Sequence, residues 1–325
     1  MPRSSLILAS ALAGLLLAGT ARAEAVVAPA IPDERCAIAP GVQAAGFRHT
    51  RSRMIRRSGA SNHRGIDVIA TDTDPVQHVA GKLAYGKVDK DIEDEDAEVF
   101  ACSAGQWRSL GTARTDDDGR FAHTLEGPAR LAPGLRDLYV AARGDASGAT
   151  FVAYVARPGE HVVVTDVDGT ITWSENAIIK SAIKGSDIRP RPNAPAGLRA
   201  SSHVVVYVTA RGDVFTEVTR QWLTRHGFPR GVMRLSRGAF ARPGAKAITY
   251  KTSVLAQLSV PIIAGIGNRQ SDIVAYTRAG VPAKQILIHL PAYADEVRAD
   301  LAAGKAIGFA DHAGLPALLP AAPRR

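Results

Sequence analysis

The sequence predicts a protein in which a small all-β domain precedes an α/β domain with a doubly wound parallel sheet. Between about residues 76 and 157, short runs of alternating character are separated by turn-forming clusters, which is typical of a β-sandwich. After Arg157-Pro158-Gly159, short apolar runs alternate with amphipathic helical segments, and this pattern indicates a parallel sheet covered on both faces. The 325 residues, 46% of them hydrophobic, provide enough apolar material for both cores.

The α/β domain, expected over residues 158–325, has elements that can be placed from hydrophobic periodicity. We expect strands at residues 161–165, 203–208, 232–235, 262–265 and 285–289, and helices at residues 174–183, 213–226, 245–257 and 271–279. In an open parallel sheet, ligands bind outside the carboxyl ends of the strands. The functional side chains should therefore follow the strands directly.

The all-β domain, expected over residues 76–157, is interpreted as a transthyretin-like or Ig-like sandwich. Its run Thr115-Asp116-Asp117-Asp118-Gly119-Arg120-Phe121 resembles the hairpin of transthyretin-like and carboxypeptidase-regulatory-like domains. Three consecutive aspartates could also ligate calcium, but a calcium loop needs oxygen ligands at spaced positions. A plain turn is therefore the favoured interpretation.

The first 23 residues have the pattern of a signal peptide: Arg3, an apolar stretch at residues 6–18, and Ala21-Arg22-Ala23. We therefore expect export to the periplasm or the extracellular space. Residues 24–75 show little periodicity and are predicted to form an irregular or partly helical lead-in. Because the exported compartment is oxidising, Cys36 and Cys102 could form a disulfide, the alternative being two unpaired buried cysteines.

The chain is basic, with a formal net charge of +9. Basic residues concentrate at His49, Arg51, Arg53, Arg56, Arg57, His63 and Arg64. Such a stretch suits an anionic lipid surface or an acidic polymer, but an ordinary solvated face explains it as well. We expect no nucleic-acid partner, and the oligomeric state stays open.

Polar clusters follow the ends of several predicted strands. They are Asp166 and Asp168, then Thr209 and Arg211, then Asn268, Arg269 and Asp272, with Lys251 in the helix expected at residues 245–257. An Asp-x-Asp-Gly run alone fits a polar turn, with Asp and Gly chosen for backbone geometry. With the other clusters at the same sheet edge, two carboxylates at i and i+2 instead indicate a site that shares one hard cation. The chain has no His-x-x-x-His pair, phosphate-binding loop or Gly-x-Ser-x-Gly elbow.

Three runs carry a resemblance to a known superfamily. They are Thr165-Asp166-Val167-Asp168-Gly169-Thr170-Ile171-Thr172, Tyr207-Val208-Thr209-Ala210-Arg211 and Gly267-Asn268-Arg269-Gln270-Ser271-Asp272 with the residues up to Thr277. Together they resemble the haloacid dehalogenase superfamily, and within it the lipin-type phosphatidate phosphatases and the lipin-like domain of some phosphatidylinositol transfer proteins. The resemblance covers about residues 161–291 and says nothing of the sandwich.

The resemblance implies a phosphatase mechanism. Asp166 would be the nucleophile that forms an aspartyl-phosphate, Asp168 would donate and then accept a proton, and Thr209 and Lys251 would stabilise the phosphoryl group. The implied substrate-binding residues are Gly169, Thr170, Ala210 and Arg211, and the implied Mg²⁺ ligands are Asp166, Asp168, Asn268 and Asp272. Lys246 competes with Lys251, Arg269 could pair with a nearby carboxylate, and Thr209 could be a helix cap.

The short stretches between the motifs leave no room for a separate cap domain, so we expect an open site. An open mouth suits a phosphate on a lipid surface, and the leading hypothesis is hydrolysis of phosphatidate or a related lipid phosphate to diacylglycerol and phosphate. Two alternatives remain at this point. The first is a non-catalytic module that binds anionic lipid, and the second is a phosphatase for a non-lipid phosphomonoester.

Overall fold

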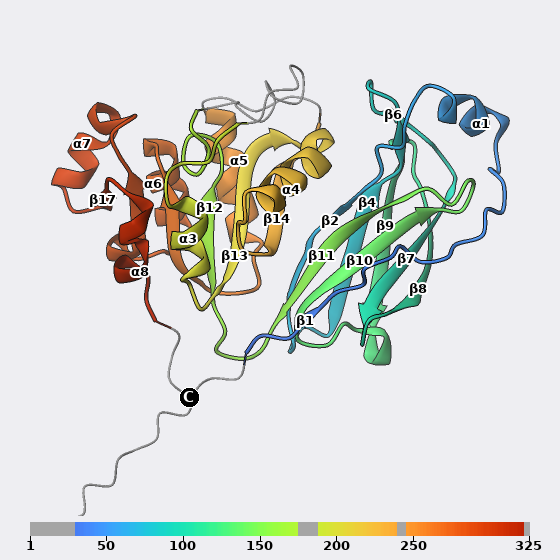
Figure 1. The fold of residues 1–325 in the computed structure, drawn as a ribbon, viewed down its shortest axis with the longest axis horizontal. Coiled ribbons are helices and arrows are strands. Elements are labelled where there is room, and N and C mark those ends of the chain that lie inside the picture. The colour runs from blue at the N-terminus through green and yellow to red at the C-terminus, as the bar shows by residue number, and fades with distance from the viewer. Residues whose placement is uncertain (1–29, 175–187, 239–244, 322–325) are drawn as a thin grey trace, which may run out of the picture. The chain divides into compact units, whose positions relative to one another are not determined.

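Six parallel strands form the sheet of the α/β domain, in the order β14-β13-β12-β15-β16-β17 (Figure 1). The computed structural model describes residues 30–174, 188–238 and 245–321. The strands are β12 (Val162–Asp166), β13 (Val204–Gly212), β14 (Gly231–Ser236), β15 (Ile262–Gly267), β16 (Ile286–His289) and β17 (Ile307–Phe309). The expectation of a parallel sheet is thus confirmed, with β12 in its interior between β13 and β15.

Helices cover both faces of this sheet, because successive side chains of a strand point to opposite faces. Val162 and Val164 pack in one core cluster with residues of α5 (Ala245–Ala256), α6 (Gln270–Arg278) and α7 (Ala294–Ala302). Val163 packs in another with residues of α3 (Ala194–Arg199), α4 (Thr216–Arg225) and α8 (Leu315–Leu318). Burial on both faces explains why β12 reads as a continuous run of valines.

The all-β domain is a sandwich of a larger and a smaller sheet. The larger runs β3-β11-β10-β7-β8 with β1 alongside β10, and the smaller runs β2-β4-β9. The strands are β1 (Asp33–Glu34), β2 (Arg64–Ile66), β3 (Val68–Thr71), β4 (Val76–Lys82), β7 (Asp96–Ser103), β8 (Gln106–Arg114), β9 (Arg120–Glu126), β10 (Gly134–Ala142) and β11 (Gly148–Ala156); β5 (Ala84–Tyr85) and β6 (Lys90–Asp91) form a separate pair. Their shared core holds Leu138, Val140 and Phe151 from one sheet and Val79, Phe121 and Leu125 from the other.

Several elements differ from the sequence-based expectations. The predicted lead-in contains the helix α1 (Thr50–Arg56) but also β2 and β3, which pair with β4 and β11, so the sandwich starts earlier than the pattern indicates. The helix expected from residue 213 begins as the short turn η2 (Asp213–Phe215), and further short turns are η1 (Gly127–Ala129), η3 (Ala283–Gln285) and η4 (His312–Gly314). Strands of three or four residues show too few alternations to be recognised.

The turn at residues 116–119 has the geometry of a plain turn. Asp116 Oδ1 accepts hydrogen bonds from the backbone N–H groups of Asp118 and Arg120, at 3.0 and 2.8 Å. Gly119 has a φ of +67°, a conformation that a residue with a side chain adopts only with strain. The Asp116 side chain therefore stabilises the backbone of the turn, in agreement with the turn interpretation.

The disulfide suggested by the two cysteines is confirmed. Cys36 is bridged to Cys102 of β7, with their Cα atoms 5.8 Å apart. The bridge ties the segment before α1 to the larger sheet of the sandwich. The predicted signal peptide and nearly all of the predicted helix at residues 174–183 lie outside the described residues. In the parts of the chain that the structure covers, no helix combines the length and apolar character needed to cross a bilayer.

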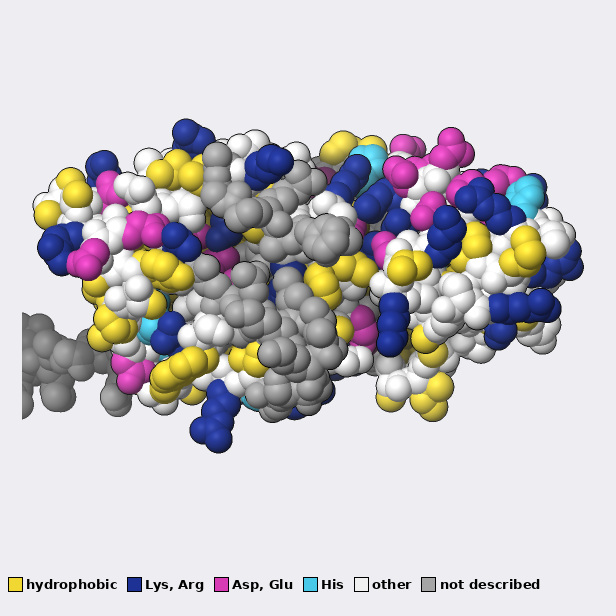
Figure 2. All heavy atoms as spheres, turned by 90° about the horizontal axis from the view of Figure 1, so that it is seen from above, with side chains coloured by type: hydrophobic (Ala, Val, Ile, Leu, Met, Phe, Trp, Pro, Cys, Tyr) yellow, Lys and Arg dark blue, Asp and Glu magenta, His cyan; other side chains and the backbone are white. Residues whose placement is uncertain are grey.

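The basic stretch around α1 is paired with acidic side chains of the sandwich. Arg51 contacts Glu93 at 2.6 Å, Arg56 contacts Asp145 at 2.7 Å, and His49 lies 2.8 Å from Asp94. In the space-filling view, basic and acidic side chains intermingle over the sandwich (Figure 2). The structure therefore favours the solvated, internally paired interpretation of this stretch.

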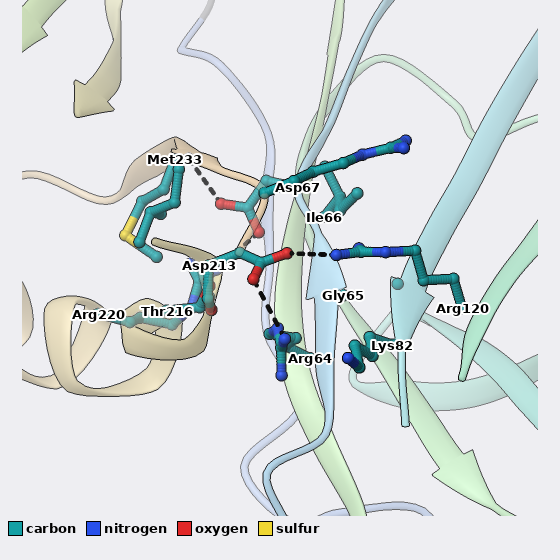
Figure 3. Close-up of a pocket in the computed structure, with 13 residues that line it drawn as sticks. Arg64, Gly65, Ile66, Asp67, Lys82, Arg120, Asp213, Thr216, Arg220 and Met233 are labelled. Carbon is teal, nitrogen blue, oxygen red and sulfur yellow. Dashed lines mark hydrogen bonds and ion pairs between the residues drawn. The ribbon is translucent and has the colours of Figure 1, made fainter. Parts of the chain in front are cut away.

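Residues Ala30–Pro323 form one compact unit. Within it, buried carboxylates connect the β-sandwich to the α/β domain. Asp67, between β2 and β3, accepts hydrogen bonds from Val152 N at 2.9 Å, Met233 N at 2.7 Å and Arg220 at 2.6 Å. Asp213, directly after β13, accepts from Arg64 and Arg120, both at 3.1 Å (Figure 3). Removing one partner from such a buried ion pair is strongly destabilising.

His63 is a buried, titratable residue of the sandwich, so its burial can be tested through the pH dependence of stability. Its ring is 4% exposed, its Nδ1 accepts from Ala84 N at 3.1 Å, and its Nε2 lies 2.9 Å from Ser147 Oγ. Burial lowers the pKa of His63 to about 4 from an ordinary 6.5. The unfolded chain therefore binds a proton between these values that the folded chain does not.

We predict that His63 makes the free energy of unfolding fall as the pH drops from about 6.5 to 4, by at most about 3 kcal/mol. Urea unfolding across this pH range should give a shallower dependence for His63→Gln than for the unmodified protein. Parallel curves for the two proteins would contradict the prediction.

Candidate active site

The predicted polar clusters meet at the carboxyl edge of the sheet because their strands are neighbours. Asp166 is the last residue of β12, Thr209 lies near the end of β13, and Asn268 directly follows β15. Since β12 pairs with both β13 and β15, these three positions are adjacent. The arrangement follows from the sheet order and not from closeness along the chain.

Asp166 is buried and held through both carboxylate oxygens. It is 4% exposed, its Oδ1 accepts from Lys251 Nζ at 2.6 Å, and its Oδ2 accepts from Thr170 Oγ1 at 2.9 Å. The loop between Asp166 and Thr170 turns at Gly169, whose φ is +78° and whose N–H donates to Thr172 Oγ1. Glycine is needed here to bring the Thr170 hydroxyl back to the strand end.

Lys251 lies between two acidic side chains. Its ammonium is 2.6 Å from Asp166 Oδ1 and 2.6 Å from Asp272 Oδ1. Asp272 Oδ2 in turn accepts from the backbone N–H groups of Asn268 and Arg269, at 3.0 and 3.1 Å, and so caps α6. Lys246, the competing residue, is exposed on α5. The structure therefore brings Lys251 into the cluster.

Electrostatics couple these three groups. Burial raises the pKa of Asp166 to about 7, against the opposing attraction of Lys251. Burial by itself would lower the pKa of Lys251, but Asp166 and Asp272 raise it above its ordinary value. One ammonium thus serves two carboxylates, and a further cation at the site would favour the ionised form of Asp166.

Asp168 is held separately from Asp166, by two donors from β13. Thr209 Oγ1 donates to Asp168 Oδ2 at 2.7 Å, and Arg211 Nη2 donates to Asp168 Oδ1. The Arg211 side chain has no exposed surface, and its Nη1 donates to Thr219 Oγ1 of α4 at 2.8 Å. Arg211 was expected to bind substrate, but in the structure its guanidinium is buried against Asp168. Thr219 carries no motif signal and was missed.

The remaining predicted residues have varied surroundings. Thr170 is fully buried on Asp166, and the Ala210 carbonyl accepts from Ser236 Oγ at 2.9 Å. Arg269 pairs with Glu296 at 2.8 Å, as the alternative for this residue anticipated. Asn268 is 1% exposed, and its Nδ2 has no hydrogen-bond partner among the described residues.

The carboxylate and amide oxygens of this site are suitable ligands for a hard cation. Within residues 30–174, 188–238 and 245–321, no three His, Cys, Asp or Glu side chains are grouped as a metal site. Mg²⁺, however, is commonly held by one or two carboxylates together with waters and substrate phosphate. The side chains of Asp166 and Asp272 meet at the Lys251 ammonium, and the buried Asn268 is joined to Asp272 by its backbone N–H. The Asp168 carboxylate is held by Thr209 and Arg211, and the resemblance implies that its main-chain carbonyl is the ligand.

Two family models match the chain, one for each domain. Residues 163–289 match the LNS2 domain of the family described as PITM 1-3. Residues 61–155 match the β-sandwich domain of the same family. The matched sandwich region includes β2 and β3, in agreement with the strand pairing.

Several known proteins are similar in sequence to this chain over most of its length. Membrane-associated phosphatidylinositol transfer protein 3 of Mus musculus is 29% identical over 259 residues, covering 78% of this chain and 26% of the relative. The corresponding protein 1 of Rattus norvegicus is 27% identical, covering 81% and 20%. Protein retinal degeneration B of Drosophila melanogaster is 26% identical, covering 77% and 20%. The chain thus spans about a quarter or less of the length of these relatives.

Solved structures resemble this chain only weakly. A β-glucuronidase of Ruminococcus gnavus aligns at 8% identity over 72% of this chain and 45% of its own, with a TM-score of 0.28.

We predict that Lys251→Met lowers the free energy of unfolding by about 3 kcal/mol or more, because two buried carboxylates then lose their shared cation. Urea unfolding measures the change. The matched control is Lys246→Met on the exposed side of the same helix, where a change within about 0.5 kcal/mol is expected. Equal effects of the two substitutions would show that the cluster does not depend on Lys251.

Proposed function

We propose that this chain is a magnesium-dependent phosphatase of the haloacid dehalogenase type that forms an aspartyl-phosphate on Asp166. Its preferred substrate is phosphatidate or a related lipid phosphate, hydrolysed to diacylglycerol and phosphate. The observation that carries the proposal is the pair of separately held carboxylates. Asp166 is oriented by Lys251 and Thr170, and Asp168, two residues on, is oriented by Thr209 and Arg211.

In the first step, a carboxylate oxygen of Asp166 attacks phosphorus, and the bond from phosphorus to the lipid oxygen breaks. Thr170 and Lys251 fix the carboxylate so that little reorganisation is needed at the moment of attack. The Lys251 ammonium also balances charge near the transferring phosphoryl group.

Asp168 serves the proton transfers. In its protonated form it gives a proton to the departing alkoxide, and as a carboxylate it then takes a proton from the water that hydrolyses the aspartyl-phosphate. Its side chain is 20% exposed, whereas that of Asp166 is 5% exposed, so it lies nearer the solvent from which this water comes. Arg211 and Thr209 keep it in one orientation.

Asp166, Asp272, the Asn268 side chain and the Asp168 main-chain carbonyl would hold Mg²⁺. When bound, Mg²⁺ supplies positive charge for the phosphoryl oxygens and favours the ionised form of Asp166. The chain's own contribution is to bury these oxygen ligands together with Lys251 at one strand edge.

Two observations support a lipid as the substrate. The matching relatives carry names that describe them as membrane-associated proteins that transfer phosphatidylinositol. The motifs around Asp166 and Asp272 also resemble those of lipin-type phosphatidate phosphatases. The open site is expected from the short stretches 170–204 and 209–251, of which residues 175–187 and 239–244 lie outside the described residues.

We predict that the protein releases phosphate from phosphatidate in mixed micelles with Mg²⁺, and that Asp166→Asn lowers the rate by about a thousand-fold or more. Chelation of Mg²⁺ should abolish release, and added Mg²⁺ should restore it. Phosphate release is measured directly, with glucose 6-phosphate and a phosphopeptide as non-lipid substrates. Equal rates for Asp166→Asn and the unmodified protein would refute the mechanism, whereas preference for a non-lipid substrate would refute only the substrate class.

The second candidate function is binding of anionic lipid without turnover. The names of the relatives in Mus musculus and Rattus norvegicus, which describe transfer and not hydrolysis, favour it. Vesicle flotation that survives chelation of Mg²⁺, with no phosphate release under any condition, would establish it. Both Asp166 and Asp168 are present and oriented, and this favours catalysis.

We further predict that Arg211 acts by positioning Asp168. Thr219→Val removes the hydroxyl that holds the far side of the Arg211 guanidinium and should lower kcat about ten-fold with little change in KM. Arg211→Lys should have a larger effect on kcat, because an ammonium cannot reach Asp168 and Thr219 in the same planar arrangement. A rise in KM alone would instead indicate that Arg211 binds the substrate phosphate.

A further inference from the structure

Two arginines lie over aromatic rings, on segments that follow β12, β15 and β16. The guanidinium carbon of Arg191 lies 5.1 Å from the centre of the Trp173 ring, and that of Arg269 lies 4.1 Å from the centre of the Tyr293 ring. We call Trp173, Arg189 and Arg191 the aromatic-arginine rim.

The rim is attached to the loop that carries the two aspartates. Trp173 N donates to the Arg189 carbonyl at 3.3 Å, and Arg191 N donates to the Ile171 carbonyl at 2.8 Å. Arg191 Nη2 also donates to the Gly169 carbonyl at 3.3 Å, one residue from Asp168. These hydrogen bonds fix the position of the rim relative to the loop that carries Asp166 and Asp168. A ligand that binds the rim is therefore held close to this loop.

The Trp173 side chain is largely exposed, and packing within the domain does not explain its large apolar ring. Its exposed fraction is 58%, and among the large hydrophobic side chains exposed in the described part of the chain it is the aromatic one; the others are Ile38, Met54, Val88 and Ile307. The catalytic chemistry proposed above makes no use of it. A single exposed hydrophobic residue is ordinary, but one that is stacked on an arginine at a catalytic loop requires a reason.

The chemistry of the rim matches the surface of an anionic bilayer. Tryptophan and tyrosine favour the boundary between headgroups and acyl chains, where one end of the ring is apolar and the other wet. Arg189 is exposed and its carbonyl accepts from Trp173 N, and the Arg191 guanidinium lies over the Trp173 ring. Glu296 balances Arg269, and attraction to anionic headgroups therefore comes from Arg189 and Arg191.

We propose that the aromatic-arginine rim docks the chain on an anionic lipid surface, with the Trp173 ring inserted at the headgroup level and the arginines on lipid phosphates. This rests on the proposed function, because docking at this place presents a headgroup phosphate to Asp166. It adds the surface by which the site reaches a lipid that stays in its bilayer.

Flotation of the protein with vesicles tests the docking without any requirement for catalysis. The vesicles contain phosphatidylcholine alone or phosphatidylcholine with phosphatidylglycerol. We expect binding to the anionic vesicles, weakening with salt, and about ten-fold weaker partitioning for Trp173→Ala, since a large apolar side chain no longer enters the interface. Trp173→Phe should restore part of the binding, and Val88→Ala, which removes exposed apolar surface on the sandwich, should bind like the unmodified protein.

Tryptophan fluorescence gives a second measurement. Of the three tryptophans, Trp222 is buried and Trp107 lies on the sandwich, where its indole N–H donates to the Ile38 carbonyl. Addition of anionic vesicles should shift the emission to the blue, and Trp173→Phe should remove most of the shift. Unchanged flotation and an unchanged shift in the Trp173 variants would overturn the proposal.

Activity separates this proposal from the proposed function. For Trp173→Ala, the ratio of hydrolysis of vesicle phosphatidate to hydrolysis of a soluble phosphomonoester should fall about ten-fold, the same factor as binding. If no phosphate is released from any substrate but vesicle binding still depends on Trp173, the phosphatase proposal fails and the docking surface stands. If hydrolysis proceeds and the ratio is unchanged, the docking surface is wrong and the phosphatase proposal stands.

Discussion

The contact of one ammonium with two carboxylates fixes the geometry of the candidate site. Lys251 of α5 joins Asp166 at the end of β12 to Asp272 at the start of α6, each at 2.6 Å. Without this cation, two buried acidic groups would face each other with a strong mutual repulsion. The strand end and the two helices are thus brought to one point by charge, and all three elements also contribute residues to apolar core clusters of the domain.

The two aspartates have different environments although only one residue separates them. Asp166 is in the interior with a lysine and a threonine, and Asp168 is partly exposed between a threonine and an arginine. A reaction that needs both a nucleophile and a proton donor can use this difference. Two carboxyl groups of the same residue type take different roles because their surroundings differ. Val167, which lies between them in the chain, is fully buried.

Much of the fold follows from sequence patterns, and the limits of prediction have physical causes. The valine run of β12 and the polar residues after β12, β13 and β15 are local signals, so the sheet and the meeting of Asp166, Thr209 and Asn268 could be predicted. Contacts between residues distant in the chain leave no such signal. The burial of Arg211 on Asp168 depends on Thr219 of α4, and the early strands β2 and β3 are defined by partners far along the sequence.

Asp67 gives the sandwich a role at the outer strand of the parallel sheet. β14 ends the sheet, and a terminal strand offers unpaired backbone groups to any other chain. Asp67 takes the N–H of Met233, and its carbonyl receives the side chain of Arg234, so part of this edge is already occupied from within the molecule. The sandwich thereby protects the α/β domain from strand-to-strand aggregation, and a fragment cut at the domain boundary would lose that protection.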